Sequence, residues 1–256
     1  MVIPELEKED HFGYIIGRQV GDKVLIQPEA NVTRAEVVTV FFRLLTEESR
    51  DKYWSSTNDF SDVAATSWFN NAVSTMTRAG IINGYPDGTF HPNAPITRAE
   101  LATIAVRFFE VQKSDKNIFS DTARHWAVQF INAAAENNLI TGYPDGTFKP
   151  NQNIKRAEFI TVVNRMIERK PDKQHLLPKD QMINWDDNPE NAWYYEQVQE
   201  ATNSHEYEWI TVMNEQGEGV VIENWTKPLP MRDWVQLEKE WSDAHSGGNP
   251  GEVIEP

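Results

Sequence analysis

The sequence predicts a mainly α-helical protein in which three related repeats form a pseudo-threefold assembly around a helical-bundle core, with a small C-terminal extension. Two observations carry this prediction. A turn segment occurs twice, at 83–93 (NGYPDGTFHPN) and 141–151 (TGYPDGTFKPN), at an offset of 58 residues (141 minus 83). A helix with one apolar face follows a Thr-Arg-Ala-Glu or Lys-Arg-Ala-Glu motif at three places.

Each repeat contains two helices separated by the Tyr-Pro-Asp-Gly turn, in which proline presets one dihedral and glycine accepts a positive φ. The apolar positions of the first helix recur at the spacing of one helix face: Phe69, Ala72, Val73 and Met76 in the second repeat. The second helix of that repeat begins near Ile96, where Thr97 and Glu100 have the capping-box spacing.

The second helix occurs three times with an equivalent apolar face. The three faces are Val37, Val40, Phe41 and Leu44; Leu101, Ile104, Ala105 and Phe108; and Phe159, Val162, Val163 and Met166. The third copy has Lys155 where the others have threonine, and loss of the capping hydroxyl should cost the start of that helix about 1 kcal/mol. Three equivalent amphipathic helices predict the pseudo-threefold core.

The first repeat lacks a tryptophan-bearing first helix, and we expect residues 184–205 to supply it. Trp185 and Trp193 are 8 residues apart (193 minus 185), as are Phe60 and Trp68 (68 minus 60). The predicted boundaries are therefore 11–57 for the second half of repeat 1, 58–115 for repeat 2, 116–170 for repeat 3, 171–183 for a linker and 184–205 for the completing helix.

The C-terminal extension, residues 206–245, departs from the repeat pattern. Residues 209–213 and 220–225 can pair as a β-hairpin across a glycine-containing loop, and residues 231–241 can form a short helix. Residues 246–256 are rich in glycine and are expected to form a flexible tail.

The composition excludes several classes of partner. The chain has 256 residues, 39% of them hydrophobic, which is typical of a folded protein. The 39 acidic residues outnumber 24 basic ones, for a formal net charge of -15, which argues against binding to nucleic acid or to an anionic membrane surface. There is no cysteine, no nucleotide-binding glycine loop and no zinc or calcium motif, so we expect no cofactor and no bound metal.

The start of the sequence bears on localisation. The first ten residues are acidic, and neither a signal peptide nor an apolar run of about 18 residues is present, so we expect no membrane insertion. If the parent protein is exported, this chain is a mature piece or an excised part of it.

These motifs at these spacings resemble the S-layer homology domain of bacterial surface proteins. The resemblance rests on Phe-Ser-Asp at 60–62 and 119–121, the following tryptophan, Gly-Tyr-Pro-Asp-Gly-Thr-Phe and Ile-Thr-Arg-Ala-Glu, and it covers roughly residues 11–205. It implies modules that assemble in threes and bind secondary cell-wall polymers, often pyruvylated, in grooves between the repeats. It also implies an extracellular location on the bacterial cell surface.

An arginine follows the cap of each second helix: Arg34, Arg98 and Arg156. Free amides and the helix dipole favour an anion there, and a guanidinium can hold the carboxylate of a pyruvyl group through two hydrogen bonds. In the alternative interpretation, each arginine pairs with a neighbouring acid such as Glu100 on the solvated face. We rank the groove around Arg98 first, and Arg34 last, because the turn at 18–22 (RQVGD) departs from the repeated pattern.

Aromatic and acidic side chains complete the candidate ligand site. The tryptophans that open each first helix can stack on sugar rings or, alternatively, fill the core: Trp68, Trp126 and Trp193. The aspartates can accept sugar hydroxyls or, alternatively, start a helix: Asp62, Asp121 and Asp187. The turn tyrosines are expected to line the grooves: Tyr85 and Tyr143.

These features predict a non-catalytic module that holds a protein on the bacterial cell wall by binding wall polysaccharide, with the rest of a larger surface protein as a further partner. Two alternatives stay open. A glycoside hydrolase would suit the many Asp, Glu and Trp residues, but it needs two carboxylates at one bond, whereas the repeat distributes its acids over three units. A purely structural protein-interaction module would use residues 209–241 as its contact surface.

Overall fold

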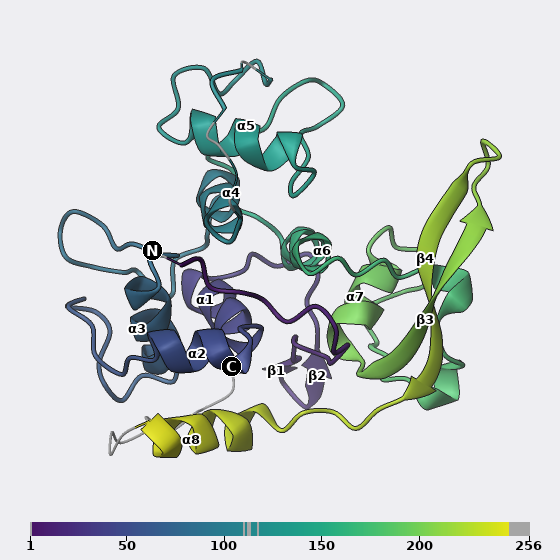
Figure 1. Ribbon diagram of the computed structural model, residues 1–256, viewed down its shortest axis with the longest axis horizontal. Coiled ribbons are helices and arrows are strands. Elements are labelled where there is room, and N and C mark those ends of the chain that lie inside the picture. The colour runs from purple at the N-terminus through teal and green to yellow at the C-terminus, as the bar shows by residue number, and fades with distance from the viewer. Residues whose placement is uncertain (1, 110, 112–113, 117, 246–256) are drawn as a thin grey trace. The chain divides into compact units, whose positions relative to one another are not determined.

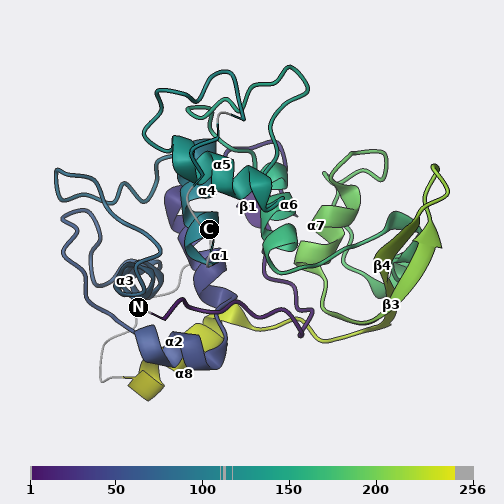
Figure 2. The ribbon, with the colours of Figure 1, turned by 45° about the horizontal axis from the view of Figure 1, so that its top comes forward.

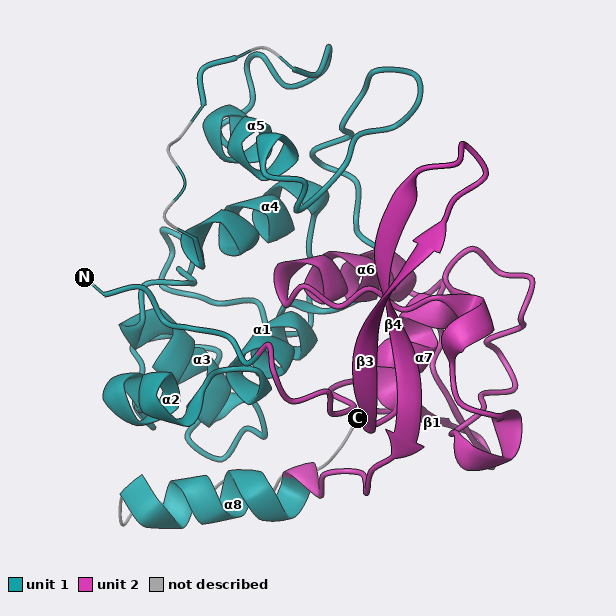
Figure 3. Cartoon of the chain, turned by 45° about the vertical axis from the view of Figure 1, so that its right-hand side comes forward, with its two compact units in different colours: residues 1–7, 31–154, 235–255 teal, residues 8–30, 155–234, 256 magenta. Residues whose placement is uncertain are grey.

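The computed structural model describes residues 2–109, 111, 114–116 and 118–245, which form two compact units (Figure 3). Of the described residues, unit 1 comprises those in 2–7, 31–154 and 235–245, and unit 2 comprises residues 8–30 and 155–234. The predicted tail, 246–256, lies outside the described residues. Within the described part of the chain, no helix combines the length and the apolar character needed to cross a bilayer. The repeat boundaries stay predictions.

Unit 1 is helical. Its elements are α1 (Arg34–Arg43), α2 (Glu47–Tyr53), α3 (Asn70–Arg78), α4 (Arg98–Arg107), α5 (Val128–Glu136) and most of α8 (Trp234–His245) (Figure 1). Helix α3 packs on α1, and α5 packs on α4. Each predicted first helix in this unit therefore packs on the second helix that precedes it in the chain.

Unit 2 combines two helices with two small antiparallel hairpins. Its elements are β1 (Arg18–Val20), β2 (Lys23–Leu25), α6 (Arg156–Met166), two 3-10 turns, η1 (Lys173–His175) and η2 (Lys179–Gln181), α7 (Tyr195–Thr202), β3 (His205–Met213) and β4 (Gly219–Pro228). Helix α7 packs on α6, which repeats the pairing seen in unit 1. The predicted C-terminal hairpin is confirmed as β3 and β4, which pair from His205 with Pro228 to Met213 with Gly219 (Figure 2).

The second helices start where the sequence predicts, because two of them carry a complete capping box. The hydroxyl of Thr97 accepts a hydrogen bond from the Glu100 amide at 3.3 Å, and the Glu100 carboxylate accepts one from the Thr97 amide at 2.8 Å. Helix α1 has the same pair between Thr33 and Glu36. At the start of α6, Lys155 has no side-chain acceptor, so only one of the two capping-box hydrogen bonds forms. In that bond the Lys155 amide donates to the Glu158 carboxylate at 2.9 Å.

The predicted apolar faces are the core of the two units. All four face residues of α1 are at most 6% exposed, those of α4 at most 7% and those of α6 at most 3%. Burying a side chain of this size contributes roughly 1.5–3 kcal/mol, so these faces are the main source of helix stability. The assignment of the chain as mainly α-helical is confirmed.

One aspartate in each repeat ties down a short left-handed segment. The equivalent residues Gln27, His91 and Lys149 have positive φ values of 52°, 55° and 56°. A non-glycine residue in this region is strained. The aspartate carboxylate accepts hydrogen bonds from the amide of that residue and of the residue before it: Asp62 from Phe90 and His91, Asp121 from Phe148 and Lys149, and Asp187 from Ile26 and Gln27. The carboxylates therefore compensate the strain.

Residues 184–205 are joined directly to the N-terminal segment within unit 2. Besides the Asp187 bonds to residues 26 and 27, the carbonyl of Ala201 in α7 accepts hydrogen bonds from the amides of Tyr14 and Ile15 at 2.8 and 2.9 Å. Glycine is required where these segments meet, because a Cβ at Gly17 would lie 2.7 Å from Cζ3 of Trp185.

Helix α8 is held in unit 1 by its polar and aromatic side chains. Glu238 accepts a hydrogen bond from Nε of Arg43 at 2.6 Å, and both side chains are buried. The ring of Trp241 packs edge-on against Phe42, with centroids 5.7 Å apart. The predicted short helix at 231–241 is thus present, beginning three residues later than expected, at Trp234.

Candidate functional site

The three predicted arginines have equivalent positions, and all of them are buried. Arg34, Arg98 and Arg156 are 7%, 4% and 5% exposed. In each, Nε donates to one backbone carbonyl and Nη2 to another, in the turn segment of a different repeat: Phe90 and Asn83 for Arg34, Phe148 and Thr141 for Arg98, and Ile26 and Ile16 for Arg156. The guanidinium groups are therefore not on a solvated face, since each braces a turn from inside the protein, but the expected pairing with an acid is present for Arg34, whose Nη1 lies 2.8 Å from Oε1 of Glu100.

These bonds correct the assumption behind the ranking of the arginines, namely which turn each of them contacts. Arg34 faces the Tyr-Pro-Asp-Gly turn of the second repeat, with its Cζ 4.8 Å from the centroid of the Tyr85 ring. Arg98 lies in the same way 4.7 Å from the Tyr143 ring. The departing turn at 18–22 belongs to the segment that Arg156 braces. The sequence ranking placed the irregular turn beside Arg34, because it assumed that each arginine serves the turn of its own repeat.

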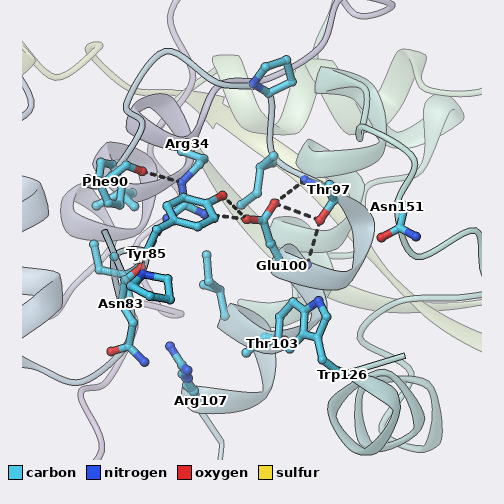
Figure 4. Close-up of a pocket in the computed structure, with 17 residues that line it drawn as sticks. Arg34, Asn83, Tyr85, Phe90, Thr97, Glu100, Thr103, Arg107, Trp126 and Asn151 are labelled. Atoms are coloured by element: carbon cyan, nitrogen blue, oxygen red, sulfur yellow. Dashed lines mark hydrogen bonds and ion pairs between the residues drawn. The ribbon is translucent and has the colours of Figure 1, made fainter. Parts of the chain in front are cut away.

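A groove of about 690 Å³ lies in unit 1 around Arg34 (Figure 4). It brings together three predicted site residues, Arg34, Tyr85 and Trp126, whereas Arg98 is not among its lining residues. The rest of the lining is Val38, Ile82, Asn83, Gly84, Pro86, Phe90, Pro95, Ile96, Thr97, Glu100, Thr103, Ile104, Arg107 and Asn151. The volume falls in the range of small-molecule and sugar sites, roughly 300–1,000 Å³.

Glu100 is the centre of the polar network in this groove. Its Oε1 accepts hydrogen bonds from Nη1 of Arg34 at 2.8 Å and from the Tyr85 hydroxyl at 2.7 Å, while its Oε2 accepts from Thr97. Burial alone would raise the pKa of the Glu100 carboxyl, but the hydrogen bonds from Tyr85 and Thr97 and the charge of Arg34 outweigh it, and the pKa is lowered. Burial and the bond to Glu100 raise the pKa of Tyr85 to about 12. Glu100 is therefore an anion and Tyr85 a neutral donor at neutral pH.

Arg107, at the end of α4, is a lining residue that sequence reasoning missed. Its Nη1 donates to the carbonyl of Ile81 at 2.8 Å, and burial lowers its pKa. A signal was present, because an arginine occurs 9 residues after each helix-start arginine (43 minus 34, 107 minus 98, 165 minus 156). Asn151, from the second copy of the turn segment, also lines the groove and was not predicted.

The charge of the groove differs in sign from that of the whole chain. The ionisable lining side chains that are charged at neutral pH are Arg34, Arg107 and Glu100, so two cations against one anion leave a net charge of +1. The chain as a whole carries -15. A local positive potential in an acidic protein favours an anionic or hydrogen-bonding ligand at this place.

The repeat tryptophans are on the surface rather than in the core. Trp126 is 64% exposed and Trp193 59%, and Trp68 is half-buried. The core position is taken by the next residue in each case, Phe69, Ala127 or Tyr194, all at most 8% exposed. The core-filling interpretation is therefore wrong for Trp126 and Trp193, whose rings are open to a ligand.

The three aspartates neither start helices nor face the groove in unit 1. Asp62 lies eight residues before α3 (70 minus 62), and both its oxygens accept backbone amides of the left-handed segment. Asp121 and Asp187 have the same role. The helix-start interpretation is thus wrong, and we do not include these carboxylates among the ligand contacts.

Comparison with known families agrees with the repeated geometry. The family model of the S-layer homology domain matches residues 59–102 and 118–160. These segments are S-layer homology domains. They lie within the second and third predicted repeats and include α3, the start of α4, α5 and the start of α6, together with the two turns that carry Tyr85 and Tyr143.

Several known proteins with related sequences share this S-layer homology region. A cellulosome-anchoring protein of Acetivibrio thermocellus is 36% identical over 205 residues, which is 78% of this chain and 44% of that protein. Cell surface glycoprotein 1 of the same organism is 35% identical over 213 residues, 77% of this chain and 9% of that protein. An amylopullulanase of Thermoanaerobacterium thermosulfurigenes is 36% identical over 152 residues, 56% of this chain and 8% of that protein. The chain therefore spans less than half the length of each of these relatives.

Proposed function

We propose that this chain holds a protein non-covalently on the bacterial cell wall by binding secondary cell-wall polysaccharide, with an acidic substituent such as a pyruvyl ketal. The observation that carries the proposal is the groove of about 690 Å³ around Arg34, which combines a net positive charge with an exposed indole ring. The family membership and the names of two relatives, a cellulosome-anchoring protein and a cell surface glycoprotein, support an extracellular anchoring role.

Trp126 is the proposed sugar platform. Its ring is 64% exposed and lies at the groove, where it can stack on the apolar face of a sugar. Figure 4 shows Trp126 and Arg107 along the groove from the network of Arg34, Tyr85 and Glu100. An extended polymer could therefore contact the aromatic ring with one residue and the cationic groups with the next.

Arg34 and Arg107 are the proposed contacts of the acidic substituent. Arg34 uses three of its five N–H donors on Phe90, Glu100 and Asn83, and the remaining two, on Nη1 and Nη2, have no hydrogen-bond acceptor among the described residues. A carboxylate that accepts from these donors would form charge-assisted hydrogen bonds, which are about twice as strong as neutral ones. Because the scaffold already orients the guanidinium, binding requires little further ordering.

The hydrolase alternative fits this groove poorly. A glycosidase needs two carboxyl groups roughly 5–9.5 Å apart, one of them with a raised pKa. Among the described lining residues Glu100 is the one carboxylate, it is held by Arg34, Tyr85 and Thr97, and its pKa is lowered. A non-catalytic binding module is therefore the better account.

The proposal is tested by sedimentation of the chain with purified bacterial wall fragments before and after chemical extraction of the secondary polymer. We expect co-sedimentation that disappears on extraction, with no release of reducing ends from the polymer. Binding that survives extraction would favour peptidoglycan or a wall protein as the partner, and release of reducing ends would favour the hydrolase. Roles of Arg98, Arg156, Tyr143, Trp68 and Trp193 in equivalent grooves stay part of the proposal.

A further inference from the structure

Four buried side chains in unit 2 bring their ligand atoms together. His11 comes from the N-terminal segment, Glu200 from α7, His205 from the first position of β3 and Glu223 from β4. All four residues are at most 3% exposed, and one ligand atom from each lies within 4.8 Å of the others. No sequence motif joins them, since they come from four separate segments.

Three of the separations match those of donor atoms around one four-coordinate ion. Nδ1 of His11 lies 3.3 Å from Nε2 of His205, 3.3 Å from Glu200 Oε1 and 3.4 Å from Glu223 Oε2. Nε2 of His205 lies 3.4 Å from Glu200 Oε2 and 4.0 Å from Glu223 Oε2. With metal–ligand distances of about 2.0–2.1 Å, the ligand atoms of a tetrahedral zinc site are about 3.3–3.4 Å apart. The separations of His11 from His205, of His11 from Oε2 of Glu223 and of His205 from Oε2 of Glu200 match this value, and the 4.0 Å between His205 and Glu223 would shorten when an ion binds.

One oxygen of each carboxylate is held by the scaffold, and the other is unsatisfied. Oε1 of Glu200 accepts a hydrogen bond from Nη1 of Arg169, and Oε1 of Glu223 accepts one from the Lys170 amide. Oε2 of both residues is buried without a hydrogen-bond partner among the described residues. A buried oxygen without a hydrogen-bond partner reduces the free energy of unfolding by about 1–3 kcal/mol, and by more if the oxygen is charged. A ligand that binds both oxygens would remove this penalty.

The histidine rings are oriented as metal ligands usually are. Nδ1 of His205 lies 3.2 Å from the carbonyl of Asn203. A carbonyl can only accept, so Nδ1 carries the proton and Nε2 presents a lone pair to the cluster. The ring of His205 stacks on that of Trp225 with centroids 3.7 Å apart, and the ring of His11 stacks on that of Tyr207 with centroids 3.8 Å apart. Outer contacts of this kind fix the tautomer and the direction of a ligating imidazole.

The summed charge of the buried side chains favours a bound cation. The two carboxylates and Arg169 sum to one negative charge in a region of low polarity, which is unfavourable without compensation. A proton on Nδ1 of His11 is the metal-free alternative, but one N–H points at one oxygen at a time. With that proton in place, the lone pair on Nε2 of His205 would still face the Glu200 carboxylate. A divalent ion changes the sum to one positive charge, whereas the proton would change it to zero, but the ion satisfies all four donor atoms at once.

We propose that His11, Glu200, His205 and Glu223 bind one divalent transition-metal ion, with Zn²⁺ as the best match to two imidazoles and two carboxylates in a four-coordinate site. Four protein ligands close the coordination sphere, which is typical of a structural rather than a catalytic site. The ion would cross-link the N-terminal segment, α7 and the β3–β4 hairpin within unit 2. This inference does not rest on the proposed wall binding.

Zn²⁺ titration of the whole chain after EDTA treatment and dialysis tests the site. We expect one equivalent of Zn²⁺ to bind and to raise the melting temperature, because the ion binds only the folded state. Outer-sphere changes usually weaken metal binding about 10–100-fold, so loss of a ligand in Glu223→Gln or His205→Gln should weaken it by at least about 100-fold. Glu206→Gln, a neighbouring exposed acid that pairs with Lys227, is the matched control and should bind as the wild type does.

Two outcomes would overturn the proposal: a wild-type chain that takes up no stoichiometric Zn²⁺, or equal binding by the wild type and Glu223→Gln. If the ligand variants do not fold, the absorption spectrum of Co²⁺ in the wild type still decides. A four-coordinate site gives intense visible bands, whereas the weak bands of a six-coordinate ion would contradict the assignment.

Discussion

Replacing Trp126 with alanine should weaken polysaccharide binding without weakening the fold. A tryptophan side chain offers up to about 250 Å² of surface. Trp126 is 64% exposed, so about 160 Å² is available, and a sugar stacked on one of the two ring faces would cover about 80 Å². At about 25 cal/mol per Å², this contributes about 2 kcal/mol, or roughly a 30-fold change in Kd.

Isothermal titration calorimetry with purified wall polysaccharide measures this change, and chemical denaturation measures stability. The free energy of unfolding should change by less than about 0.5 kcal/mol, because the ring is already in solvent. Trp209→Ala, which removes a 48% exposed tryptophan from β3 outside the groove, is the matched control and should leave Kd unchanged. Equal affinities for wild type and Trp126→Ala, or a large loss of stability, would refute the platform assignment.

Three further predictions follow from the groove and the helix caps. Arg107→Ala should weaken polysaccharide binding by about 1.5–3 kcal/mol through loss of a charge-assisted contact. Arg78 is an exposed arginine outside the groove, and Arg78→Ala should not weaken binding. Equal effects of the two substitutions in calorimetry would contradict the role of Arg107. Lys155→Thr should raise the free energy of unfolding by about 1 kcal/mol by restoring the cap of α6, and Lys155→Ala, which adds no hydroxyl, should not. The lowered pKa of Glu100 means that its ionised form stabilises the fold above the ordinary value of 4.5 and that this contribution is lost as the pH falls through the lowered pKa. The stability difference between wild type and Glu100→Gln should therefore shrink on acidification below pH 4.5, and a difference that does not depend on pH would argue against the network.

The sequence predicted the helices well, because their signals are local. Apolar spacing, the capping boxes at Thr33 and Thr97 and the turn residues act within a few positions, and the structure has the expected helices and the C-terminal hairpin. The family was also readable, since its motifs recur at a fixed offset.

What the sequence did not predict depends on pairing between repeats. Arg34 braces the turn of the following repeat, so the irregular turn of its own repeat is no reason to rank it last. Tryptophan is equally compatible with a core and a surface position, and only packing shows that Phe69, Ala127 and Tyr194 take the core. The His11 cluster joins residues up to 212 positions apart (223 minus 11), which no spacing rule detects.

Calorimetry of the wild-type chain with one polysaccharide preparation, before and after removal of its acidic substituents by mild acid, tests the central claim most directly. If the cationic groove around Arg34 and Arg107 binds an anionic wall polymer, removal should weaken binding by about 1.5–3 kcal/mol, or roughly 10- to 150-fold in Kd. The loss should be much smaller in Arg107→Ala, because the two changes remove the same contact. Equal affinity of the wild type for the native and the treated polymer would contradict the account.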